Sequence, residues 1–202
     1  MKLTTKKMVL IASFAAISVV LMFFETSLPI FPSFLKIDIS TVIVLLSGYI
    51  ISPVSAIIVA LIKDFLHLPL SQTEGIGELA DFLVSAPFVF TATIISKKLI
   101  MKKKVYATII GLIVGIAVSG VVAIAVNYWP ILPLYSKTMM PIEAIVKMAA
   151  EINPHIVDKL TLLIYVYLPF NLLKFSLVSV LAFFIYLKVI KIPLFHLNKT
   201  LK

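Results

Sequence analysis

The sequence predicts an all-α membrane protein with six transmembrane helices and with both termini in the cytoplasm. Hydrophobic residues make up 61% of the 202 residues and charged residues only 13%, whereas a soluble domain has roughly 45–50% apolar and about 25% charged residues. The mean hydropathy is +1.15. This composition excludes a soluble enzyme, a disordered chain and a nucleic-acid-binding protein. It indicates a single integral domain over residues 1–202 in a lipid bilayer, which we expect to be that of the cell (plasma) membrane.

Six apolar segments account for the predicted spans. They lie at about residues 8–24, 39–51, 54–67, 76–95, 105–128 and 160–190. About 20 helical residues cross the hydrocarbon core of a bilayer. The second and third segments are therefore short, and the sixth is long enough to protrude.

The first span follows a lysine-containing N-terminus that resembles a signal peptide. Its apolar run continues to Phe24 without a small-residue cleavage site before a polar region. This pattern favours a retained first helix over a cleaved leader.

Prolines shape two of the other spans. The second and third meet at Ser52 and Pro53, and proline disfavours a continuous helix. We expect a tight reversal between two helices there; a single long kinked helix is the alternative. Pro169 is expected to kink the sixth span.

The distribution of charge predicts the orientation. All 18 basic residues are lysines, and 12 of them lie before the first span, between the fourth and fifth, or after the sixth, where there is no acidic residue. These are Lys2, Lys6, Lys7, Lys97, Lys98, Lys102, Lys103, Lys104, Lys188, Lys191, Lys199 and Lys202. With six spans these regions share one side, which the positive-inside rule places in the cytoplasm. The formal net charge of +9 is thus a topology signal.

Three outer loops follow from this topology. They cover about residues 25–38, 68–75 and 129–158 and contain seven of the eleven prolines. Long ordered loops often carry function, so we interpret them as a lid over a site. Ordinary connecting loops are the alternative.

Lys174 is the clearest polar residue inside a predicted span. A charge near the bilayer centre costs at least about 2.5–3.5 kcal/mol, so such groups are functional candidates. Asn171 lies three residues earlier and shares its helix face, which Tyr167 extends. An amide and a cation suit the carbonyls and ring nitrogens of a polar heterocycle. A structural ion pair of Lys174 with Asp64 or Asp81 is the alternative.

The end of the fifth span carries Asn127, Tyr128 and Trp129. Tyrosine and tryptophan are common at the membrane interface, and Trp129 is interpreted as such an anchor. An amide just inside the membrane faces the protein interior, so Asn127 serves either a ligand or a helix–helix contact.

The start of the fourth span is also polar. Thr73 is a candidate helix cap, and Glu74 and Glu78 suit the positive end of the helix dipole. Asp81 lies one turn deeper, where capping does not explain it. The glycines at 75 and 77 do not form a dinucleotide-binding motif.

Asp64 and His67 are three residues apart. Two groups are too few for a metal site, and an interfacial pair between them is favoured over proton transfer. No motif of a hydrolase or an ATPase is present, so we predict neither an enzyme nor a bound metal.

Small residues mark two helix faces. Ala12 and Ala16 have the spacing that allows close helix approach, with Ala15 beside them, and Gly111 and Gly115 repeat the spacing in the fifth span. Packing within the bundle is favoured for the glycines.

Taken together, several segments resemble the riboflavin-binding S components of energy-coupling-factor (ECF) transporters. They are residues 23–25, 28–40, 61–67, 75–82, 127–128 and 169–174. The resemblance covers nearly the whole chain in order. Thr26, Ser27 and Thr41 depart from the commoner family pattern.

The resemblance implies a riboflavin-capture subunit that binds riboflavin as a transported substrate, not as a cofactor, in a cavity open to the outside. It implies that Asn127, Asn171 and Lys174 contact the flavin and that Leu35 and Lys36 cover it. It implies that Glu78 and Asp81, with Tyr128 at the end of the fifth helix, form a further wall of the cavity.

The resemblance also implies two kinds of partner, a transmembrane coupling subunit and two ATPase subunits. The docking surface for the coupling subunit would include Ala12, Ala15 and Ala16.

Two alternatives remain at this stage. One is an S component for another vitamin. The other is a stand-alone proton-coupled carrier or an intramembrane enzyme, in which Lys174 would work with Asp64 or Asp81.

Overall fold

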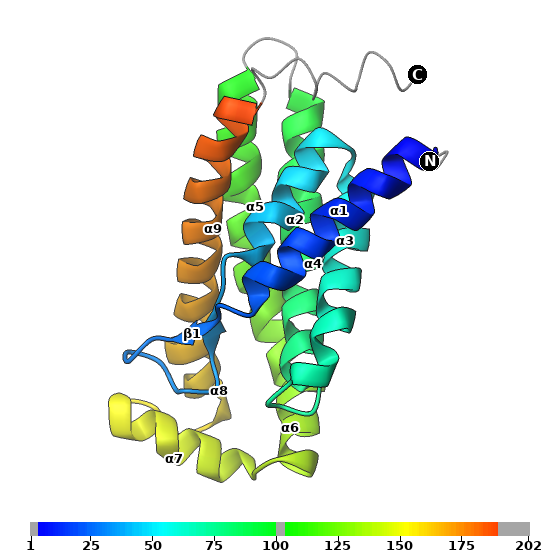
Figure 1. The fold of residues 1–202 in the computed structure, drawn as a ribbon. Coiled ribbons are helices and arrows are strands. Elements are labelled where there is room, and N and C mark those ends of the chain that lie inside the picture. The colour runs from blue at the N-terminus through cyan, green and yellow to red at the C-terminus, as the bar shows by residue number, and fades with distance from the viewer. Residues whose placement is uncertain (1–3, 100–103, 190–202) are drawn as a thin grey trace.

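The computed structural model describes residues 4–99 and 104–189, which are mainly helical. Most of the long helices run roughly along one direction, the first helix crosses them obliquely, and shorter elements cover one end of the bundle (Figure 1). The long helices are α1 (Thr5–Met22), α3 (Pro53–His67), α4 (Ile76–Leu99), α5 (Lys104–Val126) and α9 (Leu168–Val189). The all-α membrane class is confirmed.

Five helical segments of the described chain are long and apolar enough to cross a membrane. They are Thr5–Met22, Pro53–Leu70, Ile76–Leu99, Lys104–Thr138 and Lys159–Lys188. Helix α2 (Ser40–Ile50) has 11 residues, which at 1.5 Å per residue span only about 16 Å. It is buried almost all round, against α1, α3, α4 and α9. The six-span topology therefore stays a prediction.

The predicted reversal between the second and third segments is confirmed. Helix α2 ends at Ile50, and α3 begins at Pro53 and packs against α2. The Ser52 hydroxyl caps α3 by accepting a hydrogen bond from the Ser55 N–H at 3.1 Å. Proline suits the first helical position because its missing N–H would have no partner there. The alternative of one long kinked helix is wrong.

The fifth and sixth segments contain π-helical turns next to prolines. After α5 the chain continues through the π-helical turn η2 (Asn127–Ile131), which contains Pro130, into α6 (Leu132–Thr138). Before α9 it passes through α8 (Lys159–Leu162) and the π-helical turn η3 (Leu163–Tyr167), directly ahead of Pro169. Proline removes a backbone donor, and a wide turn accommodates its ring.

The end of the bundle with α6 is covered by short elements. Helix α7 (Ile142–Ile152) lies across this end (Figure 1), so most of the predicted loop 129–158 is helical. The loop after α1 forms a hairpin of β1 (Thr26–Ser27) and β2 (Lys36–Ile37). The turn between α3 and α4 contains the short 3-10 helix η1 (Leu68–Leu70).

Glycines allow α4 and α5 to pack closely. A Cβ at Gly111 would collide with the Ala92 carbonyl oxygen and the Ser96 side chain, and one at Gly115 would lie 3.0 Å from the Ala92 Cβ. The interpretation of both glycines as packing residues is confirmed.

The lysine-bearing ends that the structure describes lie toward one end of the bundle. The start of α1, the end of α4, the start of α5 and the end of α9 lie toward the end opposite α7 (Figure 1). Lys2, Lys102, Lys103, Lys191, Lys199 and Lys202 lie outside the described residues. The arrangement supports the predicted sidedness, and the cytoplasmic assignment stays a prediction.

Candidate ligand-binding cavity

A cavity of about 300 Å³ lies under the hairpin and α7. This is at the lower end of the range for small-molecule sites. Its walls come from the hairpin region, the η1–α4 turn, α4, η2, α6, α7 and α9. Seven of the predicted ligand residues line it: Leu35, Lys36, Glu78, Asp81, Asn127, Asn171 and Lys174.

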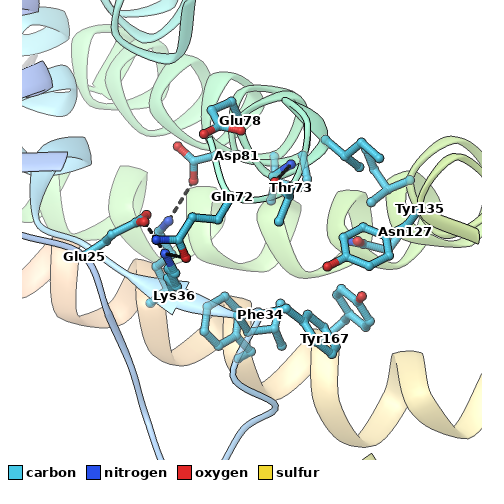
Figure 2. Close-up of a pocket in the computed structure, with 18 of the residues that line it drawn as sticks. Glu25, Phe34, Lys36, Gln72, Thr73, Glu78, Asp81, Asn127, Tyr135 and Tyr167 are labelled. Carbon is cyan, nitrogen blue, oxygen red and sulfur yellow. Dashed lines mark hydrogen bonds and ion pairs between the residues drawn. The ribbon is translucent and has the colours of Figure 1, made fainter. Parts of the chain in front are cut away.

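The cavity has two chemically different sides (Figure 2). Phe34, Tyr135 and Tyr167 lie together on one side; the ring of Phe34 is 6.0 Å from that of Tyr135 and 6.5 Å from that of Tyr167. Charged groups, including Glu25, Lys36 and Asp81, gather on the other side, whereas the amide-bearing Asn127 lies beside Tyr135. Such a site suits a ligand with a flat ring system and a polar chain.

A chain of ion pairs runs along the charged side. The Lys174 ammonium is 2.7 Å from Asp81 Oδ1 and 3.1 Å from Asp38 Oδ2. The Lys63 ammonium is 2.7 Å from Asp81 Oδ2 and 2.6 Å from Asp64 Oδ1. The predicted alternative of a structural pair for Lys174 is therefore realised with Asp81 but not with Asp64. Lys174 also lines the cavity, so pairing and ligand contact are compatible.

Asp38 anchors the end of this chain of ion pairs. Its Oδ1 accepts hydrogen bonds from the Ser40 N–H, at 2.8 Å, and from the Ser40 hydroxyl. Burial raises the pKa of the Asp38 carboxyl, but the Lys174 and Lys63 ammoniums and the Ser40 hydrogen bond outweigh burial and hold the pKa below its ordinary value. Asp38 therefore stays ionised near neutral pH.

Two buried amides face the cavity from opposite helical segments. Asn127 Nδ2 donates to the Ala123 carbonyl oxygen at 2.8 Å, and Asn171 Nδ2 donates to the Tyr167 carbonyl oxygen at 2.8 Å. Each of these bonds uses one N–H and fixes the direction of the side chain. The amide oxygen and the second N–H of each residue are then suited to hydrogen-bond a ligand.

Glu78 lies in the first turn of α4, as predicted, and also lines the cavity. Its Oε1 is 2.9 Å from His67 Nδ1, and its Oε2 accepts a hydrogen bond from the Ser71 hydroxyl at 2.7 Å. The predicted capping role of Thr73 is confirmed, because its hydroxyl accepts from the Gly77 N–H at 2.9 Å. The predicted pair of Asp64 with His67 is wrong: each has a different partner.

The hairpin supplies the cover. Leu35 lines the cavity, and Lys36 forms an ion pair with Glu25 and donates to Gln72 Oε1 at 2.9 Å. These contacts join the hairpin to the end of α1 and to the turn before α4. Met148 of α7 also lines the cavity, which supports the interpretation of the outer segments as a lid.

Tyr128 does not belong to the described cavity wall. It is 51% exposed, and the Lys159 ammonium lies 4.1 Å from the centre of its ring. The helical rotation that turns Asn127 inward turns the next residue outward. Trp129 is 80% exposed, as an interfacial anchor requires.

The alanines of α1 separate into two groups. Ala15 is 1% exposed and packs in the core, so it does not belong to the exposed face of α1. Ala12 and Ala16 are exposed. The Ser13 hydroxyl beside them donates to the Val9 carbonyl oxygen at 2.9 Å, so this small-residue face has no unpaired hydroxyl.

Sequence reasoning missed Lys63 and the role of Asp38. The rule that identified Lys174, a cation within an apolar span, applies equally to Lys63. No group of three or more potential metal ligands occurs among the described residues.

The fold and the cavity define a membrane-embedded small-molecule binding protein. The chain matches the family "ECF transporter, substrate-specific component" over residues 6–186. It therefore belongs to this family of transporter subunits, and it is a multi-pass protein of the cell membrane. The predicted resemblance to ECF S components is confirmed, and the alternative of an intramembrane enzyme is excluded because the family is not an enzyme family.

Individual relatives agree with the family. The chain is similar to the riboflavin transporter RibU of Staphylococcus aureus (strain TCH60), with 32% identity over 90% of this chain and 88% of that protein. It is similar to the riboflavin transporter FmnP of Bacillus subtilis (strain 168), with 27% identity over 91% of each chain. A solved S component of a bacterial ECF transporter matches with a TM-score of 0.72 and 30% identity, over 91% of this chain and 95% of that chain.

Proposed function

We propose that this chain is the riboflavin-binding subunit of an ECF-type importer. It captures riboflavin from outside the cell and delivers it together with an ATP-driven coupling module. The observation that carries the proposal is the two-sided cavity, in which aromatic rings face one part of a ligand and charged groups face the other. Riboflavin combines a flat tricyclic ring with an uncharged chain of hydroxyl groups. The two relatives named as riboflavin transporters support the same ligand.

The amides and Lys174 are the proposed polar contacts. The carbonyls and ring nitrogens of a flavin need both donors and acceptors, which Asn127 and Asn171 offer. Lys174 adds a donor that carries charge, and hydrogen bonds of this kind are stronger than neutral ones. Glu78 and Asp81 form the wall beside them, and Leu35 and Lys36 close the cavity.

The proposed orientation has six spans with both termini inside. Helix α2 is too short to cross alone, but it reverses directly into α3 and lies within the bundle. The lysines at the ends of α1, α4, α5 and α9 then face the cytoplasm, and the cavity faces outward.

The exposed face of α1 is the proposed contact with the transmembrane coupling subunit. Ala12 and Ala16 leave room for a partner helix, with Val9 and Val20 exposed on the same face. The sequence contains no phosphate-binding loop or ATPase motif, and the proposed source of energy is a pair of ATPase subunits in the coupling module. A stand-alone proton-coupled carrier would not require this surface.

The visible spectrum of the purified protein tests the ligand. Protein from cells grown with riboflavin is expected to carry the blue absorption of a flavin, and protein from riboflavin-free cells to be colourless and to quench the fluorescence of added riboflavin. Colourless protein that leaves riboflavin fluorescence unchanged would reject the proposal. If thiamine or biotin bound instead, the chain would be an S component for another vitamin.

A further inference from the structure

Lys63 lies directly behind the charged wall of the cavity. Its side chain is 0% exposed, and it is not among the residues that line the cavity. A buried ammonium is costly in a membrane protein unless it is paired. The burial of Lys63 is therefore explained by the acceptor groups that its ammonium binds.

The ammonium of Lys63 has three N–H donors and three acceptors. They are Asp64 Oδ1 at 2.6 Å, Asp81 Oδ2 at 2.7 Å and Met22 Sδ at 3.4 Å. All its donors are used within the protein. Lys63 has no donor left for a ligand.

Lys174 differs from Lys63 in the number of its ammonium donors that are used within the described chain. Within the described chain its ammonium donates to two acceptors, Asp81 Oδ1 and Asp38 Oδ2, and it lines the cavity. One of its three N–H donors is therefore available to a ligand.

Asp81 connects the two lysines. Each of its carboxylate oxygens is 2.7 Å from one ammonium, Oδ1 from Lys174 and Oδ2 from Lys63. This division fixes the plane of the carboxylate. Without Lys63, Oδ2 would lose its partner, and the carboxylate would turn to share both oxygens with Lys174, which would take up the donor that Lys174 offers a ligand.

We propose that Lys63 is a positioning residue for ligand binding: it holds one oxygen of Asp81, so that Lys174 keeps a donor directed into the cavity. This inference rests on the proposed function, because riboflavin is the ligand used to test it. Lys63 itself touches no ligand.

The test is a riboflavin titration of purified full-length variants, followed by flavin fluorescence. Lys63→Met is expected to weaken binding roughly tenfold or more, since it removes a hydrogen bond between charged groups next to the site. Asp64→Asn is the matched control from the same cluster. It keeps the contact between Lys63 and Asp81 and is expected to bind like the wild type.

A double-mutant cycle separates positioning from general structural damage. If Lys63 acts through Lys174, then adding Lys63→Met to a Lys174→Met protein should cause little further loss of affinity. If Lys63→Met does not fold, Lys63→Met combined with Asp64→Asn removes a cation and an anion together. That double variant is still expected to bind roughly tenfold more weakly, because Asp81 Oδ2 still loses its partner.

Four results would overturn the inference. They are unchanged affinity in Lys63→Met, unchanged affinity in its double variant with Asp64→Asn, an equal loss in Asp64→Asn alone, and an additive loss in the Lys174→Met background. Failure of the wild type to bind riboflavin would instead reject the proposed function. The two failures are therefore distinguishable.

Discussion

The Lys174 ammonium lies 2.7 Å from Asp81 Oδ1 at the wall of the cavity. This contact joins α9 to α4 and places a buried cation where a ligand can reach it. Asp38, at the end of the hairpin region, binds the same ammonium at 3.1 Å. The covering hairpin and the two helices thus meet at one charged group, which makes both folding and binding sensitive to it.

Lys174→Met is expected to destabilise the protein by about 3–5 kcal/mol, because it leaves two buried carboxylates without this partner. Denaturant-induced unfolding of the detergent-solubilised protein measures the change in the free energy of unfolding. Adding Asp38→Asn removes one of the two carboxylates and is expected to recover part of the loss. Equal stability of the wild type and Lys174→Met would show that the ion pairs do not support the fold.

Asn171→Leu and Asn127→Leu are expected to weaken riboflavin binding by roughly tenfold each, the cost of a lost hydrogen bond with a buried partner. Their melting temperatures should change little, because each amide bonds a carbonyl within its own helical segment. Equilibrium titration and thermal unfolding measure the two effects. Tyr128→Phe, outside the described cavity wall, is the control; an equal loss in this variant would contradict the assigned site.

The sequence predicted the class, most of the spans and seven residues of the cavity wall, because apolar length and isolated polar residues are local signals. The ion-pair partners of Asp64 and His67 were harder to predict from the sequence. His67 pairs with Glu78 of α4, a partner set by how α3 packs on α4, whereas Asp64 pairs with Lys63, its neighbour in the sequence. The helical continuation through Pro130 was missed because proline predicts a break, whereas a π-helical turn accommodates it.

Replacing Ala12 and Ala16 by Trp is expected to leave riboflavin binding intact and to abolish uptake into cells. Both alanines are exposed on α1, so bulky side chains there should obstruct a partner helix without disturbing the core. Ile113→Trp, at another exposed apolar position on α5, is the matched control and should transport normally. Normal uptake by the alanine variant would remove this face from the coupling interface.

Acid is expected to destabilise the protein through Asp38. Its pKa is lowered in the folded state, so its contribution to stability is present above the unfolded pKa of about 3.9 and is lost as the pH falls through the lower folded value. Melting temperatures measured from neutral pH to below about pH 4 should therefore drop at the acid end. Asp38→Asn should be less stable at neutral pH and show a smaller acid drop; an undiminished drop would assign the effect to other groups.

Titration of the purified wild type with riboflavin tests the central claim most directly. The account predicts saturable quenching of riboflavin fluorescence with one site per chain, and a weaker quenching curve for Asn171→Leu. A wild type that shows no saturable quenching, or an Asn171→Leu protein that binds as tightly as the wild type, would contradict the assignment of this cavity to riboflavin.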